Sequence, residues 1–444
     1  MSNSDVIPSH VHVALLPSSG VGHLLPFLRL AASLIRHQCS VTLITTHPVV
    51  SSSESQIIST FLSLFPQVTE KKFTLIPIDP TTANTTDPFF LQWETIRRSA
   101  HLLFPLLSSS SPLLSFIVTD VTLMTSVISI TENLRLPNYC LFTASARMLS
   151  LVSCFPSIPS SIPKASLPPA LLDSKSFLAK DLSESGKCIK HSDGVLINTF
   201  EELEKETLEM LPTKGLPTVF TLGPLLPLEF EGGSSFAPLE WLENQRKSSV
   251  VYVSFGSRTA MSKEQIRELG KGLVLSGYKF LWVVKSKIVD KEEIGDDLDE
   301  ILGHQVMNKV KKNYGFVLNR WVDQWRILSH KAVGGFMSHC GWNSVVEAAW
   351  HGIPVLGWPQ HGDQMINGEV IEAAGWGLCM KSWGWGLNNH LVKGEEIGDK
   401  IKELMENQMV RMKAAGISEA AKKSSESGGS CHNMAKLFQS LNKN

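Results

Sequence analysis

Residues 321–364 read WVDQWRILSHKAVGGFMSHCGWNSVVEAAWHGIPVLGWPQHGDQ. Inside this stretch, an apolar run at residues 333–337 leads into a turn that contains Gly341, and helical spacing follows at residues 345–350. A second apolar run lies at residues 354–358. A strand, a helix and another strand in this order form the βαβ unit of a parallel sheet. The stretch therefore predicts an α/β protein.

The same alternation extends over the rest of the chain. Further short runs, several continuously apolar as in strands buried on both faces, lie at residues 12–16, 41–45, 116–119, 195–198, 250–255, 280–284 and 316–318. Helical spacing follows two of these runs, at residues 24–37 and 263–276, and also occurs at residues 430–441. The proline-rich stretch at residues 155–169 predicts a surface loop. A break rich in Pro, Gly and Ser at residues 224–238 follows the strand-like TVFTLGP at residues 218–224 and separates two halves of roughly 200 residues each. We therefore expect two doubly wound domains that face each other across a ligand-binding cleft.

The composition excludes several classes of protein. Of the 444 residues, 43% are hydrophobic and 19% are charged, which is too apolar for a disordered chain. The formal net charge is -1, so we expect neither nucleic acid nor a membrane surface as a partner. The seven cysteines are scattered without a C-x-x-C pair, which excludes a disulfide framework and a zinc ribbon. Because we find no signal peptide and no long apolar segment, we expect a cytoplasmic protein.

The turn at residues 338–344 is the first candidate site. It leads into a helix N-terminus, where backbone N–H groups and the helix dipole favour an anion. His339, Asn343 and Ser344 add side-chain donors for a diphosphate. The same residues also fit an ordinary helix start, because Asn343 or Ser344 can be the N-cap and Ser344 with Glu347 matches a capping box. The residues alone support both interpretations equally.

Two neighbouring segments add weaker signals. Ser257 lies in a second glycine-containing turn, after the run at residues 250–255, and could add a phosphate contact. Trp321 and Trp325 lie beside Asp323 and Gln324, and an indole next to amide donors can stack on a nucleobase. A lone tryptophan is more often a core residue.

His23 and Asp120 are the candidates for acid–base chemistry. His23 follows the first predicted strand, at the sheet edge where ligands of such folds bind. With a reference pKa of about 6.5, an imidazole can accept a proton near neutral pH. Asp120 follows a later strand, where a carboxylate can fix the tautomer of a histidine or simply cap a helix.

The stretch at residues 321–364 resembles the signature box of the plant secondary-product glycosyltransferases. The W…Q start, GGF-SHCGWNS, a Glu four positions after Asn343, HG-PV-WP, the final Asp-Gln and the 44-residue length all agree. The likeness extends to PSSGVGHLLP near the start, VLINTFEELE at 195–204, LGPL at 222–225 and VYVSFGS at 251–257. This UDP-sugar-dependent family has two Rossmann-like domains, known as the GT-B fold. The resemblance implies an acceptor-binding domain at 1–235, a UDP-sugar-binding domain at 236–428 and a C-terminal helix at 429–444 that packs back on the first domain.

The resemblance also implies roles for the matching residues. Trp321 would stack on uracil, Gln324 would bond the base through its backbone, and Glu347 would hold the ribose. His339, Asn343, Ser344 and Ser257 would contact the phosphates, and Asp363 and Gln364 the sugar hydroxyls. This favours the ligand role over the helix cap, and the final Gln favours UDP-glucose. The expected donor set is Ser257, Trp321, Val322, Gln324, His339, Trp342, Asn343, Ser344, Glu347, Asp363 and Gln364.

The reaction implied by the resemblance is an inverting transfer with His23 as the general base and Asp120 as its partner. It requires no metal and no cofactor, because the UDP-sugar is a co-substrate, and we expect a monomer. WVDQ at 321–324 and the segments 254–270 and 87–103 are similar to the branch that C-glycosylates flavonoid precursors such as phloretin-like dihydrochalcones and 2-hydroxyflavanones. The expected acceptor residues are Phe89, Phe90, Trp93, Arg97 and Phe142, although aromatic residues equally suit an ordinary core.

Four alternatives remain. An O-glucosyltransferase needs the same base, and only the pose of the acceptor differs. A non-catalytic UDP-sugar-binding protein would bind the donor without transfer. An NAD(P) oxidoreductase would need a glycine at position 25, where Leu25 stands. A metal-dependent transferase would use Asp297 and Asp299, but no predicted strand leads into them.

Overall fold

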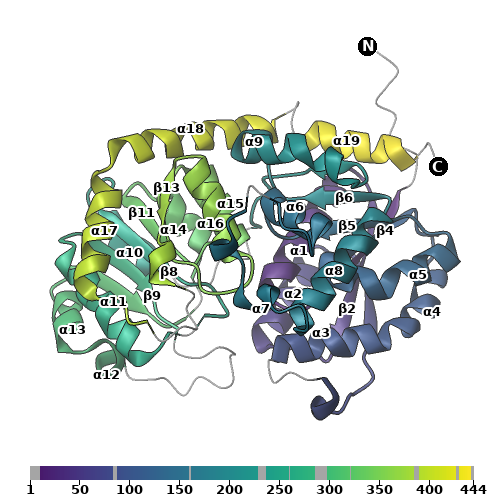
Figure 1. The fold of residues 1–444 in the computed structure, drawn as a ribbon, viewed down its shortest axis with the longest axis horizontal. Helices are drawn as coiled ribbons and strands as arrows, with labels where there is room; N and C mark the ends of the chain where they lie inside the picture. Colours follow the sequence, from purple (N-terminus) through teal and green to yellow (C-terminus); the bar gives the residue numbers. More distant parts are fainter. Residues whose placement is uncertain are drawn as a thin grey trace. The chain divides into compact units, whose positions relative to one another are not determined.

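The computed structural model describes residues 11–83, 88–159, 162–228, 237–259, 261–285, 298–320, 322–384, 390–426 and 430–441. The chain divides into two compact units. Unit 1 comprises Met1–Ile162, Pro169–Pro227 and Lys423–Asn444, and unit 2 comprises Pro163–Pro168 and Leu228–Lys422. The boundary expected at residues 235 and 236 lies outside the described residues. Figure 1 shows the strands of each unit enclosed by helices.

Unit 1 is built on a seven-stranded parallel sheet of order β3-β2-β1-β4-β5-β6-β7. Its strands are β1 (His12–Leu16), β2 (Ser40–His47), β3 (Thr69–Thr74), β4 (Phe116–Asp120), β5 (Asn138–Phe142), β6 (Gly194–Ile197) and β7 (Val219–Thr221). Every residue of β1, β4, β5 and β6 is buried, as expected for parallel strands covered on both faces.

The helices of unit 1 cover this sheet. They are α1 (Val21–Arg36), α2 (Ser52–Leu64), α3 (Pro88–Ser99), α4 (Leu103–Ser108), α5 (Met124–Leu134), α6 (Ala146–Cys154), α7 (Pro169–Leu172), α8 (Phe177–Lys190), α9 (Glu201–Met210) and α19 (Ser430–Leu441). Serine caps start several of them, since Ser51 accepts from the Glu54 N–H and Ser145 from the Met148 N–H. Helix α19 buries Leu437 and Phe438 and bonds to β7 and β5 through Asn433 and Ser440, so it is part of unit 1.

Unit 2 is built on a six-stranded parallel sheet of order β10-β9-β8-β11-β12-β13. Its strands are β8 (Val250–Ser254), β9 (Lys279–Val283), β10 (Gly315–Leu318), β11 (Val333–Ser338), β12 (Val355–Gly357) and β13 (Gly377–Cys379). Its helices are α10 (Ala237–Glu243), α11 (Lys263–Leu275), α12 (Leu298–Leu302), α13 (His304–Lys311), α14 (Gln324–Ser329), α15 (Trp342–His351), α16 (Gln364–Ala373), α17 (Gly394–Glu406) and α18 (Gln408–Ser425), the last of which continues into unit 1.

Both sheets reverse their strand order at one point. In unit 1, successive strands are added on one side of β1 up to β3, and the next strand, β4, lies on the other side of β1. In unit 2, the same reversal occurs between β8 and β11. Loops that leave the carboxyl ends of such adjacent strands diverge, and ligands of open α/β sheets bind there. His23 follows β1 and Asp120 is the last residue of β4, while Ser257 and His339 follow β8 and β11.

Three strands and one loop differ from the sequence-based expectation. Strands β3, β5 and β13 were not predicted, because β3 buries only Phe73, β13 has three residues and β5 carries a buried asparagine. The proline-rich stretch at residues 155–169, which its composition predicts to be a surface loop, is buried in part. Ser166 and Leu167 are 0% and 1% exposed, and Ser166 donates a hydrogen bond to Glu369 of α16.

Candidate functional site

His23 and Asp120 lie together at the strand-order reversal of unit 1. The Nδ1 atom of His23 lies 2.9 Å from Oδ2 of Asp120, whose side chain is fully buried. The other carboxylate oxygen, Oδ1, accepts from the backbone N–H and the hydroxyl of Thr122 at 2.9 and 2.8 Å. The helix-cap role and the histidine-partner role of Asp120 therefore coexist, one on each oxygen.

This geometry assigns the tautomer of His23. A carboxylate only accepts hydrogen bonds, so the proton of a neutral imidazole lies on Nδ1 and the lone pair on Nε2. The hydroxyl of Thr143, which follows β5, lies 3.2 Å from the same Nδ1. The His23 side chain is 31% exposed, so the ring combines a buried partner with an accessible edge. Such a pair is suited to accept a proton at Nε2 and to stabilise the resulting imidazolium.

The loop before His23 is held by a second carboxylate. Gly20 precedes α1 with a φ of 102°, a conformation that favours glycine. Its backbone N–H donates to Oε1 of the buried Glu54 at 2.6 Å. Helix α1 begins at Val21, so His23 lies in its first turn rather than in the preceding loop.

In unit 2, helix α15 begins at Trp342, earlier than the sequence predicted. Its N-cap is Gly341, and within the described residues no side chain caps it there. The capping-box interpretation of Ser344 and Glu347 is therefore wrong, because both residues lie inside the helix. Asn343 and Ser344 lie in the first turn, where the helix dipole is positive.

His339 lies against this turn, in space that two glycines provide. A Cβ at Gly256 would come within 2.5 Å of Nε2 of His339, and one at Gly341 within 2.4 Å. Burial, and secondarily the nearby His361, lowers the pKa of His339 to about 3. The imidazole is therefore neutral at physiological pH and offers a hydrogen-bond donor rather than a charge.

Gln324 connects two of the expected donor residues. Its Nε2 donates to Oγ of Ser344 at 2.9 Å and to Oε2 of Glu347 at 2.8 Å, and both partners are buried. Its Oε1 accepts from the hydroxyl of Tyr252 in β8 at 3.3 Å. Val322 and Trp342 are buried beside these residues, with 7% and 3% of their surface exposed.

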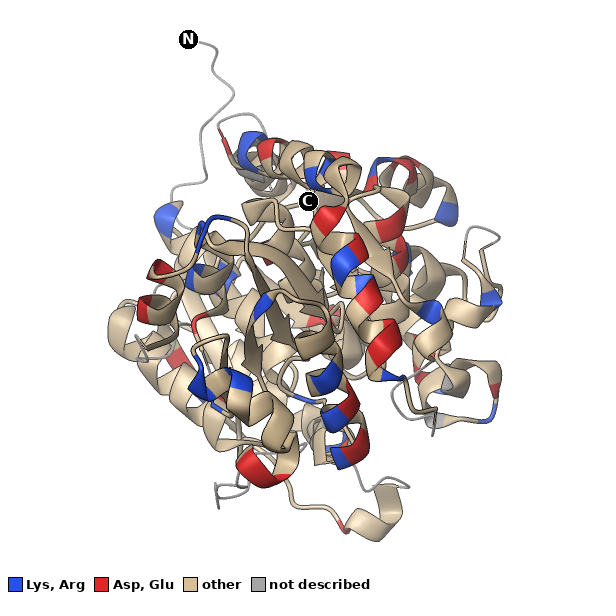
Figure 2. Cartoon of the chain, turned by 90° about the vertical axis from the view of Figure 1, so that its left-hand side faces the viewer, with Lys and Arg blue, Asp and Glu red and all other residues tan. Residues whose placement is uncertain are grey.

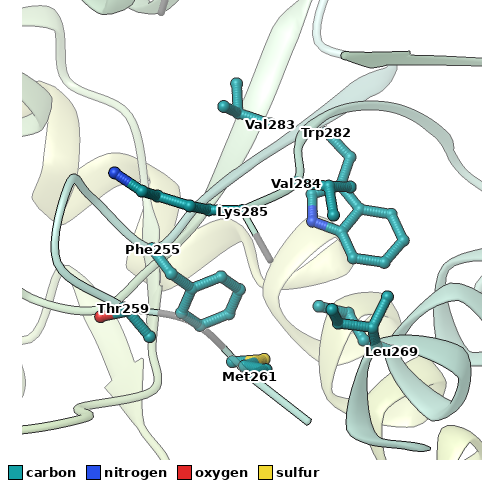
Figure 3. Close-up of a pocket in the computed structure, with 9 residues that line it drawn as sticks. Phe255, Thr259, Met261, Leu269, Trp282, Val283, Val284 and Lys285 are labelled. Atoms are coloured by element: carbon teal, nitrogen blue, oxygen red, sulfur yellow. The ribbon is translucent and has the colours of Figure 1, made fainter. Parts of the chain in front are cut away.

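The turn that contains Ser257 borders a small apolar pocket in unit 2, since Phe255 and Thr259 are among the residues that line it. Phe255, Met261, Leu269 and Trp282 line the pocket, and Figure 3 shows the rings of Phe255 and Trp282 facing it. Lys285 also lines the pocket, but its side chain points away from these rings (Figure 3) and donates to the backbone carbonyl of Ser257. This contact ties the turn at residues 255–259 to the end of β9.

Asp363 and Gln364 are engaged by their own loop. Oε1 of Gln364 accepts from the backbone N–H groups of Gln360 and His361 at 2.9 and 3.0 Å. Asp363 accepts from the side-chain amide of Asn367 at 2.7 Å. With both acceptor positions of its oxygen occupied, Gln364 can contribute only its NH2 group to a ligand.

The residues expected to bind the acceptor are engaged in contacts within unit 1. Trp93 donates its indole N–H to the carbonyl of Thr122 at 2.6 Å and stacks on Phe90 with ring centroids 5.7 Å apart. Phe142 is 2% exposed in the core, and Arg97 bonds to Asp181 of α8 at 2.9 Å. Phe89 lies beside Gly20 and is 9% exposed. A ligand role for these five residues stays a prediction.

Two expected residues lie outside the described part of the chain. They are Trp321, expected to stack on a base, and Asp297 of the metal-dependent alternative; its partner Asp299 is exposed in α12. Among the described residues, no three His, Cys, Asp or Glu side chains are grouped to hold a metal ion. Figure 2 shows acidic and basic residues interspersed along the helices in view.

In the same described residues, no helix is both long and apolar enough to cross a membrane.

Sequence reasoning missed three contacts of the site, which are those of Thr143 with His23, of Tyr252 with Gln324, and of Glu54 with the backbone of Gly20 before His23. Thr143 could have been found from strand β5, because polar residues that follow parallel strands gather at one sheet edge. Glu54 and Tyr252 give no such signal, since one lies within a helix and the other within an apolar strand.

Comparisons with known proteins agree with this arrangement. The sequence model of the family described as "UDP-glucoronosyl and UDP-glucosyl transferase" matches residues 191–419. The chain is 54% identical to UDP-glycosyltransferase 708G2 of Citrus unshiu, over 97% of this chain and 96% of that protein. It is 42% identical to UDP-glycosyltransferase CGT of Oryza sativa subsp. indica, over 99% and 98% of the two chains.

Solved structures show the same architecture. The crystal structure of LpCGTa in complex with UDP has a TM-score of 0.87 and 43% identity, over 97% of this chain and 99% of that chain. Phytolacca americana UGT2 complexed with UDP-2fluoro-glucose and pterostilbene has a TM-score of 0.83 and 25% identity, over 97% and 100%. The chain therefore belongs to the plant family 1 UDP-glycosyltransferases, enzymes of the GT-B fold with two Rossmann-like domains, and resembles their C-glycosyltransferase branch.

Proposed function

We propose that this enzyme transfers glucose from UDP-glucose to a flavonoid precursor with inversion at the anomeric carbon, and that it forms a carbon–carbon bond. The acceptor class is a phloretin-like dihydrochalcone or a 2-hydroxyflavanone. The single observation that carries the proposal is the His23–Asp120 pair, with a contact of 2.9 Å and a fully buried carboxylate. A phenolic acceptor needs this base, because its hydroxyl is largely protonated near neutral pH.

The chemical step begins with proton transfer from a phenolic hydroxyl to Nε2 of His23. The negative charge of the phenolate reaches the ortho carbon, which attacks the anomeric carbon as the bond to the UDP oxygen breaks and UDP leaves with the electron pair. The attacked carbon then loses its proton to solvent, which restores the aromatic ring as a phenolate. His23 returns the first proton to the phenolate oxygen and is neutral again. Asp120 stabilises the imidazolium during this step, as a charge-assisted hydrogen bond does.

The departing UDP carries the charge that unit 2 must stabilise. The positive end of α15, the hydroxyl of Ser344 and the neutral imidazole of His339 offer an uncharged, preorganised set of donors. The NH2 group of Gln364 is the donor that we assign to a sugar hydroxyl. The glucose donor is supported by the UDP-2fluoro-glucose bound in Phytolacca americana UGT2, and a phenolic acceptor by its pterostilbene.

The carbon linkage is supported by the relatives named CGT and LpCGTa, which are 42% and 43% identical to this chain. The test is incubation with UDP-glucose and phloretin, followed by hot acid. A carbon–carbon glucoside survives this treatment, whereas an ether-linked glucoside releases glucose. Release of glucose would refute C-glycosylation and favour the O-glucosyltransferase.

His23→Ala separates catalysis from binding. We expect this variant to bind UDP like the wild type, since the donor residues belong to unit 2, and to lose transfer. Transfer that persists in the variant would refute the role of His23. Absence of transfer in the wild type with intact UDP binding would favour a non-catalytic UDP-sugar-binding protein.

A further inference from the structure

A chain of hydrogen bonds runs from strand β8 to the first turn and the face of helix α15. It consists of the Tyr252 hydroxyl, the Gln324 carboxamide, and then Ser344 and Glu347. Tyr252, Ser344 and Glu347 are 1%, 8% and 5% exposed, while Gln324 is half-buried, so these bonds are partly shielded from water. Polar groups that are paired with one another in such surroundings restrict one another's orientation.

The orientation of the Gln324 amide follows from its neighbours. Glu347 is a carboxylate and only accepts, so the NH2 group of Gln324 must face it. The carbonyl oxygen then faces Tyr252. Burial raises the pKa of Tyr252 well above its usual value, so its hydroxyl stays protonated and donates. The hydroxyl thus favours the orientation in which the amide supports Glu347.

This orientation prepares both partners of Gln324. The Ser344 oxygen accepts from Gln324, which leaves its single hydroxyl hydrogen to be donated to an anion. Oε2 of Glu347 is fixed at 2.8 Å from the amide nitrogen, so the rotation of its carboxylate is restricted. A vicinal diol such as that of ribose needs a carboxylate in a defined plane, because it offers two donors in a fixed geometry.

We propose that Tyr252 and the Gln324 side chain are positioning residues that hold Glu347 in the orientation that binds the ribose diol of the nucleotide. This inference rests on the ribose role of Glu347 in the proposed function. The ring of Tyr252 stacks on Phe336 of β11 at 4.9 Å, and the two residues are paired in register. The ring therefore serves the core, while only the hydroxyl serves the nucleotide.

The test combines Tyr252→Phe with a nucleotide that lacks the diol. Dissociation constants of UDP and 2′,3′-dideoxy-UDP are measured by calorimetry for the wild type and the variant. The control is Tyr139→Phe, which removes the hydroxyl of an equally buried tyrosine, bonded to Ser440 at 3.0 Å in unit 1. Gln324→Leu, which removes the whole amide, is the second variant.

We expect the wild type to prefer UDP over the dideoxy nucleotide by about 10-fold or more, the range of hydrogen bonds to a charged group. Tyr252→Phe should weaken the binding of UDP by about 3- to 10-fold and the binding of dideoxy-UDP by less than about 2-fold. Gln324→Leu should show the same selective loss, larger in size, and Tyr139→Phe should change neither constant.

Four results would overturn the inference. Equal weakening of both nucleotides by Tyr252→Phe, or weakening of neither, would mean that the hydroxyl does not act through the ribose contact. A much larger fall in melting temperature than in Tyr139→Phe would make the hydroxyl a general structural support. If the wild type itself binds both nucleotides equally, the ribose role of Glu347 in the proposed function fails, and the positioning role fails with it.

Discussion

Asp120→Asn tests the proposed base most directly, because the structure dictates how the new amide must lie. In the wild type, Oδ1 accepts from two groups of Thr122 while Oδ2 faces Nδ1 of His23. The backbone N–H of Thr122 is always a donor, so the asparagine keeps its oxygen there and turns its NH2 group toward His23. His23 must then accept at Nδ1, which moves its proton to Nε2 and removes the basic lone pair.

The expected loss has two parts. The bond from His23 to a fully buried carboxylate is charge-assisted and contributes about 1.5–3 kcal/mol, or about 10- to 150-fold in rate. A misplaced proton removes general base catalysis, which is typically worth about 10²- to 10⁴-fold. Because the two effects share one bond, we expect kcat to fall by about 10²- to 10⁴-fold in total.

The assay is initial-rate kinetics with UDP-glucose and phloretin, together with calorimetric binding of UDP. We expect the UDP dissociation constant to stay unchanged, since Asp120 belongs to unit 1. The control is Thr143→Val, which removes the hydroxyl 3.2 Å from the same Nδ1 but leaves the carboxylate, and which should cost less than about 10-fold. A kcat for Asp120→Asn within 10-fold of the wild type, about 1.4 kcal/mol, would refute the reasoning.

Three further predictions concern single groups. Gly256→Ala places a Cβ 2.5 Å from Nε2 of His339 and should weaken UDP binding by about 10-fold or more. The control Gly277→Ala, with a similar φ but open space around it, should only lower the melting temperature, because an alanine in the left-handed region costs roughly 1 kcal/mol of stability. Equal UDP affinities in the two variants would contradict this. Glu204→Ala removes the carboxylate that accepts from the Ala146 and Arg147 N–H groups and the Thr199 hydroxyl, and thermal unfolding should show unit 1 destabilised by about 3 kcal/mol or more. Glu204→Gln should lose less stability, and a larger loss in the glutamine variant would contradict the prediction. Burial, and secondarily the charge of Lys422, lowers the pKa of His351 to about 4, so its neutral form contributes stability that is complete above the unfolded pKa of about 6.5 and is lost as the pH falls toward 4, by at most about 3 kcal/mol. His351→Gln should reduce the dependence of the urea denaturation midpoint on pH between pH 4 and 6.5. The same pH dependence in the variant and the wild type would exclude this role.

Local sequence patterns predicted the parts of the fold that are continuously apolar. The predicted run at residues 12–16 coincides with β1, and residues 430–441 form α19 as their helical spacing indicates. Strand β3 escaped prediction because its sequence, TEKKFT, buries a single phenylalanine. Helix α15 was predicted to begin too late, because a capping box within the sequence competes with the glycine that the structure uses.

The candidate site shows the same division between local and long-range information. The sequence by itself determined which chemical groups are present: a histidine after β1, an aspartate at the end of β4, and a helix start with donors after β11. These follow from residue type and local pattern, which neighbouring residues fix. Only the tertiary structure decided that His23 meets Asp120, 97 residues away, and that Tyr252 reaches Gln324, 72 residues away. The physical reason is that these contacts depend on which strands lie side by side, and strand order is set by the packing of the whole sheet rather than by any one segment.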